Sequence, residues 1–228
     1  MKVLLTGFTP FGNLEMNPSQ VLVEEIAARM RTSDDFLVIV EVLPTEFEAA
    51  GQRIQTLIRQ NLPDVILGLG VATERSVISL ERIALNLDDT AMPDNTGLSP
   101  RGTKIVNEGP LAYATTLPID YLQESLEEKG IPVEISNHAG TYVCNHTFYL
   151  ARHQIEELGL NSMCGFIHLP LVADTNDYRG HHTLTLFGLV LVIEYCLELL
   201  KKFYSTNDQI KQRYEIRHSL HQRALRQV

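Results

Sequence analysis

A cysteine at the start of a predicted helix is the residue of this 228-residue chain best suited to covalent chemistry. Phe148, Ala151 and Ile155 recur at the spacing of one buried helical face, and counting back four from Phe148 reaches Cys144. Cys144 therefore lies in the first turn, where the positive end of the helix dipole favours a thiolate and unpaired N–H groups can hold an oxyanion. The position suits a nucleophile for acyl transfer, although most buried cysteines are inert.

A histidine at the end of a predicted strand is the second residue with suitable chemistry. His168 lies near the end of the apolar run 163–169, just before Pro170. Side chains near strand ends line the crevice of open α/β sheets, where ligands bind. The position of His168 is therefore compatible with a site.

A glutamate stands among the apolar positions of another predicted strand. In the run 76–87, Glu81 shares its parity with Ile83, so its carboxylate would point inward. A buried carboxylate is costly unless it is paired or hydrogen-bonded, which favours a functional site. The alternatives are that Arg82 and Glu81 form a solvated edge or that the strand breaks at Ser79, and the pattern alone leaves them open.

Strand-like and helical runs alternate along the chain, which predicts a layered α/β fold. The predicted strands are 2–6, 36–42, 64–69, 76–87, 133–136 and 163–169. The predicted helices are 18–30, 46–60, 119–129, one that starts near Cys144, and a long apolar one over 183–203. Turn residues predict a long structured loop or hairpin over 88–109. We expect one domain over 1–205, followed by a basic helical tail over 206–228.

Composition argues against several classes of protein. The net charge of −9 argues against nucleic acid or an anionic membrane as the main partner, and no apolar run is long and clean enough to span a bilayer. The run 1–7 is predicted as a first strand and not as a signal peptide. Three cysteines cannot all pair, which favours a reduced, cytoplasmic protein. The histidines and cysteines show no firm ligand spacing, so no metal is expected.

Several motifs agree in order and spacing with one known family over roughly residues 1–200. They are Leu5-Thr6-Gly7-Phe8, Pro10-Phe11-Gly12, Asn17-Pro18-Ser19, 81–86, 93–97, 139–146 and 167–170. In these motifs the chain resembles the pyroglutamyl peptidase I family of cysteine peptidases, also called pyrrolidone carboxyl peptidases. The resemblance implies a single-domain α/β/α sandwich with a mixed, mostly parallel central sheet, no metal or cofactor, and assembly as a homo-oligomer, a dimer or a tetramer. It also implies removal of an N-terminal pyroglutamyl residue from peptides.

The same resemblance implies roles for individual residues. Cys144 would be the nucleophile, His168 the general base and then the acid, and Glu81 the group that orients the imidazole. The residues implied around the pyroglutamyl ring are Phe8, Phe11, Met16, Thr45, Val71, Tyr142 and Val143.

Two positions depart from the family pattern. Val71 stands where a glutamine is usual, and Ala91 stands where an arginine is a candidate for steadying the oxyanion. Losing one oxyanion donor typically costs about 100- to 1000-fold in turnover. Two alternatives therefore stay open: a related thiol hydrolase with a different small acyl or amide substrate, and a non-catalytic binding homologue.

Overall fold

The computed structural model describes residues 1–30, 36–171 and 184–206, so nearly all of the predicted tail over 206–228 lies outside the described residues. Within the described part, six strands form one sheet in the order β2-β1-β3-β8-β4-β7. Their bounds are β1 Lys2–Phe8, β2 Leu37–Leu43, β3 Val65–Val71, β4 Ile78–Glu81, β7 Val133–Ser136 and β8 Met163–Leu169. β7 and β8 have the predicted limits, and the other strands of this sheet shift by one or more residues.

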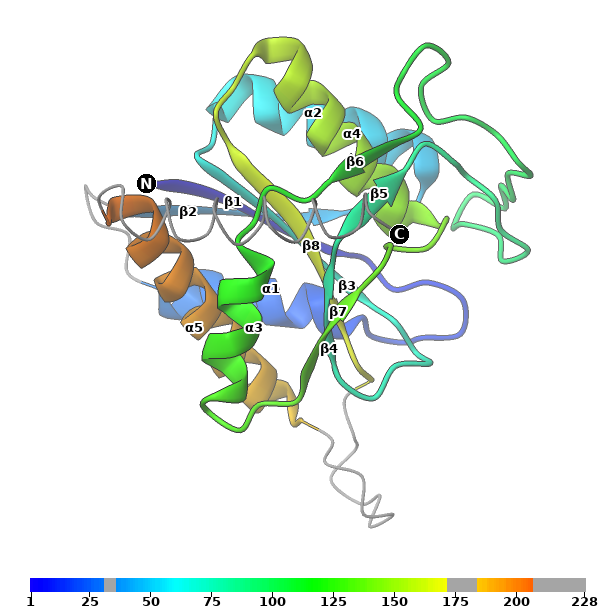
Figure 1. The fold of residues 1–228 in the computed structure, drawn as a ribbon. Coiled ribbons are helices and arrows are strands. Elements are labelled where there is room, and N and C mark those ends of the chain that lie inside the picture. Colours follow the sequence, from blue (N-terminus) through cyan, green and yellow to red (C-terminus); the bar gives the residue numbers. More distant parts are fainter. Residues whose placement is uncertain (31–35, 172–183, 207–228) are drawn as a thin grey trace, which may run out of the picture.

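The direction of the strands makes the sheet mixed and mostly parallel (Figure 1). β1 runs parallel to both β2 and β3, and β3 runs parallel to β8. β4 is antiparallel to β8, and β7 is parallel to β4. The prediction of a mixed sheet is confirmed, and the strand direction reverses between β8 and β4.

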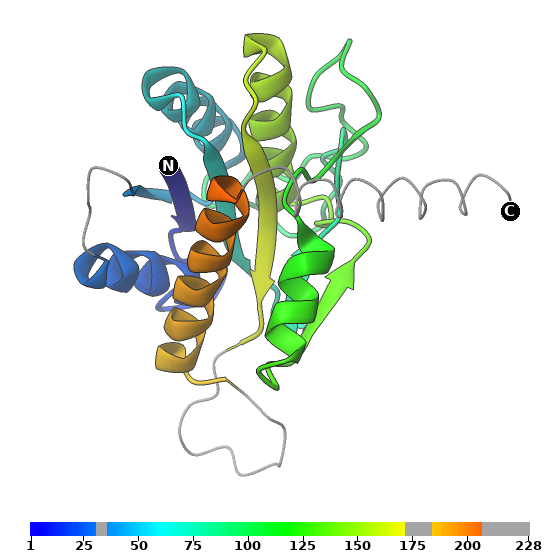
Figure 2. The ribbon, with the colours of Figure 1, turned by 60° about the vertical axis from the view of Figure 1, so that its left-hand side comes forward.

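Helices cover both faces of the sheet and give three layers (Figures 1 and 2). Two of them, α2 (Phe47–Asn61) and α4 (Val143–Leu158), lie on one face. Among the described residues, three more, α1 (Pro18–Arg29), α3 (Ile119–Glu127) and α5 (Leu186–Ser205), lie on the opposite face. The predicted α/β/α sandwich is therefore confirmed.

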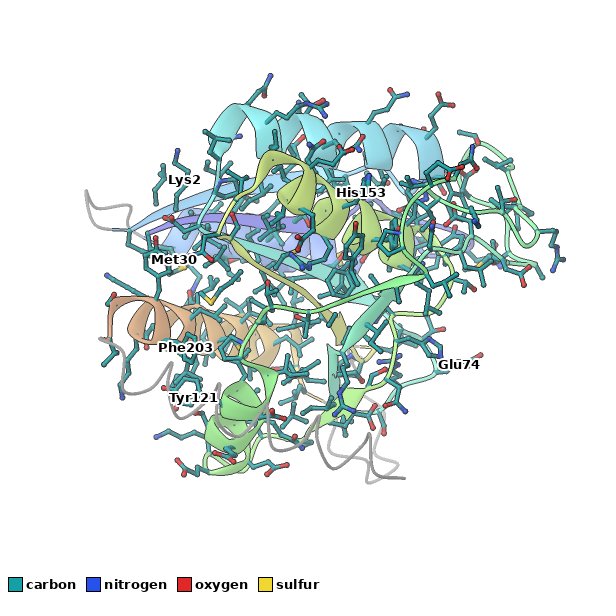
Figure 3. The ribbon with its side chains drawn as sticks, turned by 45° about the horizontal axis from the view of Figure 1, so that its top comes forward. Lys2, Met30, Glu74, Tyr121, His153 and Phe203 are labelled. Carbon is teal, nitrogen blue, oxygen red and sulfur yellow. The ribbon has the colours of Figure 1, made fainter. Side chains whose placement is uncertain are left out.

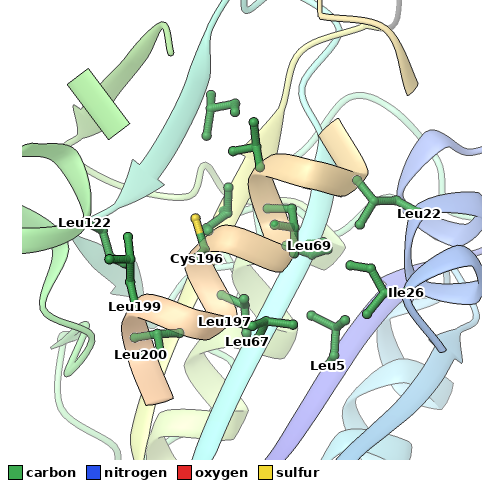
Figure 4. Packing of buried hydrophobic residues seen from close by; sticks show 14 of the residues in the cluster. Leu5, Leu22, Ile26, Leu67, Leu69, Leu122, Cys196, Leu197, Leu199 and Leu200 are labelled. Carbon is green, nitrogen blue, oxygen red and sulfur yellow. The ribbon is translucent and has the colours of Figure 1, made fainter. Parts of the chain in front are cut away.

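Alternate residues of the central strands pack into two separate hydrophobic cores, one on each face of the sheet. Leu67 and Leu69 pack beneath α5 together with Leu197 and Cys196, as Figure 4 shows. Ile66 and Phe166 point to the other face and pack under α2 and α4. Burying each Leu or Ile side chain contributes roughly 1.5–3 kcal/mol, so both faces of the sheet are held firmly. The second face is the one that carries the polar site described below.

The long apolar helix begins later than the sequence indicates. α5 begins at Leu186, because Thr185 is its N-cap and its side chain accepts a hydrogen bond from the Gly188 N–H. The charged residue Glu194 within this helix pairs with Arg29 of α1 at 2.8 Å. Among the residues that the structure describes, no helix is both long and apolar enough to cross a membrane.

The prediction of one continuous strand over 76–87 is wrong. The run divides into β4 and a short strand β5 (Ile83–Leu85), which pairs with β6 (Ala112–Ala114) in a separate two-stranded sheet. At Arg82 the chain changes partner, because its N–H donates to Ser136 O at 2.9 Å while its carbonyl accepts from Thr115 N–H at 2.8 Å. Glu81 therefore ends β4, in the main sheet.

Candidate active site

The glutamate and the histidine belong to neighbouring antiparallel strands. β4 pairs with β8 so that Ser79 lies opposite His168, which makes Glu81 a diagonal neighbour of His168 on the same face. Glu81 Oε1 lies 2.6 Å from His168 Nδ1, and the two side chains are 0% and 6% exposed. A carboxylate only accepts hydrogen bonds, so Nδ1 carries the proton and Nε2 is the basic nitrogen.

Arg75 completes the charge balance of this buried pair, and the sequence interpretation missed it. Its Nη1 donates to Glu81 Oε1 at 2.5 Å, the same oxygen that accepts from His168, whereas Glu81 Oε2 is buried and has no hydrogen-bond partner among the described residues. A buried carboxylate without a cation would be strongly destabilising, so the guanidinium offsets its desolvation. The inward parity of Glu81 indicated that its carboxylate needs a partner, but not that Arg75, six residues earlier, supplies it.

The nucleophile lies above the adjoining strand. Cys144 is the second residue of α4, as predicted, and a Cβ added to Gly70 would come within 2.8 Å of its Sγ. Gly70 is the register partner of His168 in the parallel pair β3–β8. Neighbouring strands lie about 4.8 Å apart, so the sulfur and the imidazole occupy adjacent positions on one face. Both side chains line the same cleft.

The first turn of α4 leaves backbone N–H groups without helical acceptors. Tyr142 is the N-cap and makes no side-chain cap, and the first helical hydrogen bond is donated by His146 N–H to Tyr142 O. The N–H groups of residues 143–145 therefore have no partner within the helix. Beside the sulfur, such groups can stabilise negative charge on a carbonyl oxygen under attack.

The protonation state of the thiol differs from the sequence expectation. Burial raises the pKa of Cys144 to about 12, and the nearby charge of Glu81 raises it as well. The backbone N–H of Cys144 and the charge of Arg75 lower the pKa by less than these effects raise it. A raised pKa favours the protonated thiol, so the proton of Sγ has to pass to a base during attack.

A cleft of about 270 Å³ opens beside the sulfur and the imidazole. Five residues expected around the substrate line it, namely Phe8, Phe11, Thr45, Val71 and Tyr142. Further lining residues that the sequence interpretation did not place there are Asn17, Ala72, Thr73, Glu74, Arg75, Met92, Ala139, Gly140 and Thr141. Glu74 is exposed and lies at the periphery of the molecule in Figure 3. The mainly apolar and aromatic wall suits a small neutral ring.

Two of the expected substrate residues do not line the cleft. Met16 is 55% exposed in the loop before α1, and Val143 is 0% exposed because it turns into the core as the first residue of α4. The placement of Met16 and Val143 around the substrate therefore stays a prediction that the lining of this cleft does not support. Ala91 is exposed and does not line the cleft, whereas its neighbour Met92 does.

The predicted long loop over 88–109 is structured and is attached to the cleft wall. Asp94 accepts hydrogen bonds from Phe47 N–H at 3.0 Å and from the N–H groups of Thr96 and Leu98, both at 2.9 Å. Tyr142, which lines the cleft, donates its hydroxyl to Pro93 O at 3.0 Å. The loop therefore supports one side of the substrate space and also caps α2.

All three cysteines are free, and Cys164 and Cys196 are buried. Within residues 1–30, 36–171 and 184–206, no group of three or more His, Cys, Asp or Glu side chains is placed to hold a metal ion. The cleft itself is lined by the Cys144 thiol and the His168 imidazole, and the buried Glu81 carboxylate reaches it only through its contact with His168.

Comparison with known proteins places this geometry in a family. The family model described as pyroglutamyl peptidase matches residues 1–184. The chain belongs to the pyroglutamyl peptidase family. The resemblance inferred from the motifs is thereby confirmed.

Individual members of the pyroglutamyl peptidase family are similar to this chain in both sequence and structure. A pyrrolidone-carboxylate peptidase of Oceanobacillus iheyensis is 42% identical over 169 residues, which cover 74% of this chain and 83% of that protein. The structure of pyroglutamyl peptidase I from Bacillus amyloliquefaciens has a TM-score of 0.80 at 34% identity, covering 88% of this chain and 94% of that one. A mutant pyrrolidone carboxyl peptidase from the hyperthermophile Pyrococcus furiosus has a TM-score of 0.81 at 34% identity, covering 88% and 98%.

Proposed function

We propose that the protein is a cysteine peptidase that removes an N-terminal pyroglutamyl residue from peptides. Cys144 is the nucleophile, His168 the base and then the acid, and Glu81 the group that orients the imidazole. The observation that carries the proposal is the 2.6 Å contact of Glu81 with His168, whose ring lines the same cleft as Cys144. Relatives named pyrrolidone-carboxylate peptidase support the same substrate class.

The positions of these groups support the following steps. His168 Nε2 takes the proton of the thiol as Sγ attacks the carbonyl carbon that links the pyroglutamyl residue to the peptide, and the N–H groups at the start of α4 stabilise the oxyanion. Collapse breaks the amide bond, and the imidazolium gives its proton to the leaving amine. Water, deprotonated by His168, then attacks the thioester, releasing pyroglutamate and returning the proton to Sγ.

The proposal is tested with a pyroglutamyl-fluorophore amide and a Cys144→Ala variant. We expect the parent to hydrolyse the amide and the variant to lose at least about 1000-fold in turnover, since it lacks the nucleophile. Cys196→Ala is the matched control, because Cys196 is buried on the opposite face of the sheet and should leave turnover unchanged. A Cys144→Ala variant as active as the parent would contradict the assignment.

A second candidate function rests on Val71. This side chain is 7% exposed and lines the cleft with an apolar surface where a glutamine would offer an amide to the lactam. A related thiol hydrolase that accepts a different small acyl or amide group is therefore the alternative. A panel of acyl-fluorophore amides decides between them, because turnover of the pyroglutamyl substrate well above all others removes the alternative.

A third candidate is a non-catalytic binding homologue that retains the scaffold. Incubation of the parent with a pyroglutamyl aldehyde, which forms a hemithioacetal with a functional nucleophilic cysteine, separates the two cases. Protection of Cys144 from alkylation by this aldehyde supports the peptidase. Alkylation of Cys144 that is indifferent to the aldehyde supports the binding homologue.

We further propose that the protein is cytoplasmic and works as a homo-oligomer, a dimer or a tetramer. Three free cysteines support a reduced compartment. Phe187 and Leu191, one turn apart on α5, are 59% and 45% exposed and offer apolar surface to a second copy. Light scattering of the parent tests the assembly, and a strictly monomeric protein at micromolar concentration contradicts it.

A further inference from the structure

Two segments that each adjoin a catalytic group lie side by side and are joined by hydrogen bonds. We call residues 83–89 and 139–146 together the seam. At its ends, Ala139 N–H donates to Ile83 O at 3.2 Å, and Thr141 Oγ1 donates to Asp89 O at 2.6 Å. The first segment follows Glu81 directly after Arg82, and the second contains Cys144. The seam therefore connects the strand of the orienting carboxylate to the helix of the nucleophile.

The residue next to the nucleophile makes the densest contact of the seam. Asn145 is 0% exposed, and its Oδ1 accepts from Leu85 N–H at 2.8 Å. Its Nδ2 donates to Leu85 O at 2.9 Å and to Leu87 O at 3.0 Å. The side chain thus bonds through both its NH2 group and its carbonyl oxygen, and replacing it would remove the partners of three partly buried backbone groups.

The following residue adds a second imidazole–carboxylate pair. His146 Nδ1 lies 2.8 Å from Asp88 Oδ2, with side chains 12% and 7% exposed. The ring is fixed on its other side by the edge of Phe47 and by Gly51, where an added Cβ would come within 2.7 Å of Nε2. Neither His146 nor Asp88 lines the cleft, so this pair does not touch substrate.

We propose that Asn145 and the His146–Asp88 pair are positioning residues, which hold the Cys144 sulfur in the place from which it can both transfer its proton to His168 and attack. The two residues that follow the nucleophile, Asn145 and His146, both bond to the segment 83–89. These bonds prevent α4 from sliding or rotating against the strand of Glu81. A displacement of about 1 Å at a reacting group can cost about 100-fold in rate. The turnover part of this inference rests on the proposed function, whereas the placement of the sulfur does not.

The test compares two asparagines with the same pattern of bonds. Asn86 also bonds to backbone with its whole side-chain amide, accepting from Val106 N–H at 2.9 Å and donating to Val106 O at 2.8 Å and Gly109 O at 3.3 Å. These bonds join the first seam segment to the end of the 88–109 loop and not to α4. We expect Asn145→Ala to lower kcat by about 30- to 100-fold with KM within about twofold, since transition-state geometry is lost and the cleft is kept. Asn86→Ala should lower the melting temperature comparably and leave kcat within about twofold.

A second readout needs no turnover. Because burial is the main cause of the raised pKa of Cys144, a displaced sulfur becomes better solvated and should react with iodoacetamide more than about threefold faster in Asn145→Ala than in the parent. Cys164 and Cys196 should stay unlabelled in peptide maps, which shows that the protein is folded. An inactive parent would overturn the proposed function. The ratio of Cys144 labelling rates in Asn145→Ala and the parent would still test whether the seam positions the sulfur.

A conservative pair of variants covers the case in which Asn145→Ala does not fold. His146→Asn places an amide N–H near the position of Nδ1 and can keep the bond to Asp88, whereas His146→Ala removes it. We expect His146→Ala to lower kcat about 10-fold and His146→Asn to stay within about threefold of the parent. Equal loss of kcat in Asn145→Ala and Asn86→Ala, or equal loss in the two His146 variants, would overturn the proposal.

Discussion

Gly70 lies so close beneath Cys144 that any side chain at residue 70 would meet the sulfur, since its Cβ would come within 2.8 Å of Sγ. The Phe166 ring would lie at 2.9 Å from the same Cβ. Strand β3 thus carries no side chain at the point where the nucleophile stands above the sheet. The absence of a Cβ allows the sulfur to reach the level of His168, the register partner of Gly70.

Gly70→Ala should therefore impair catalysis more than stability. We expect a loss of about 1–3 kcal/mol in unfolding free energy from overpacking and a fall of about 100-fold in kcat because the sulfur is displaced. Gly68→Ala is the control on the same face of β3, since its Cβ would meet the Phe166 ring at 2.5 Å and not the sulfur. Denaturant unfolding and steady-state kinetics measure both effects, and equal kcat losses in the two variants would disprove the relationship.

The pH dependence of alkylation tests the protonation state of the nucleophile. With the pKa of Cys144 raised to about 12, the thiolate fraction increases about 10-fold per pH unit throughout the accessible range. The rate of labelling by iodoacetamide should therefore rise without a plateau between about pH 7 and 10. A plateau near neutral pH would show instead that the helix N-terminus holds a stable thiolate.

Arg75 should make that labelling easier, because its charge lowers the pKa of Cys144. Arg75→Met removes the charge, so labelling at a fixed pH should become slower, whereas Arg75→Lys should stay near the parent rate. Arg82→Met removes the same charge one residue after Glu81 and serves as the control. If Arg75→Met labelled at the parent rate, the proposed electrostatic coupling would be refuted.

Val71 offers a test of substrate recognition. Val71→Gln introduces an amide into the apolar wall, and one added hydrogen bond of about 1 kcal/mol should raise kcat/KM for the pyroglutamyl amide roughly fivefold. Val71→Met has a similar length without the amide and shows the effect of size alone. A Gln variant no better than the Met variant would argue for a different preferred acyl group.

Asp94 should stabilise the protein in a pH-dependent way. Burial alone would raise the pKa of Asp94, but hydrogen bonds from Thr96, Phe47 and Leu98 outweigh it and lower the pKa below its usual value. Because the folded pKa is lower than the unfolded one, the stabilisation is complete above about pH 4 and is lost as the pH falls through the folded value.

The matching variant is Asp94→Asn, which keeps the shape and removes the charge. The neutral amide is a weaker acceptor for these N–H groups than the carboxylate. The unfolding free energy at pH 7 should therefore fall by about 1–3 kcal/mol, or the melting temperature by a few degrees. The difference from the parent should shrink below about pH 4. Asp89→Asn, an exposed acid in the same loop, is the control. A difference between parent and Asp94→Asn that is constant down to pH 2 would contradict the mechanism.

Local periodicity was enough to predict the elements that carry the nucleophile and the base. The run 163–169 and the start of the helix near Cys144 follow from apolar spacing, which depends on neighbours in sequence. The pairing of Arg75 with Glu81 could not follow from it, because periodicity indicates that a position is buried and not which partner it meets. The break at Arg82 was hidden for the same reason, since Glu81 and Ile83 keep one parity although the chain changes sheets there.

The position of Asp94 also bears on how the chain is made. Phe47 at the start of α2 donates its N–H to a carboxylate 47 residues downstream, and Glu46 provides no side-chain cap. During synthesis on the ribosome, the N–H of Phe47 therefore lacks this acceptor until residue 94 has been made and has folded back onto α2. Proteolytic cleavage within the 88–109 loop would then be expected to unfold the start of α2 and the side of the cleft that this loop supports, while the parallel strands stay folded.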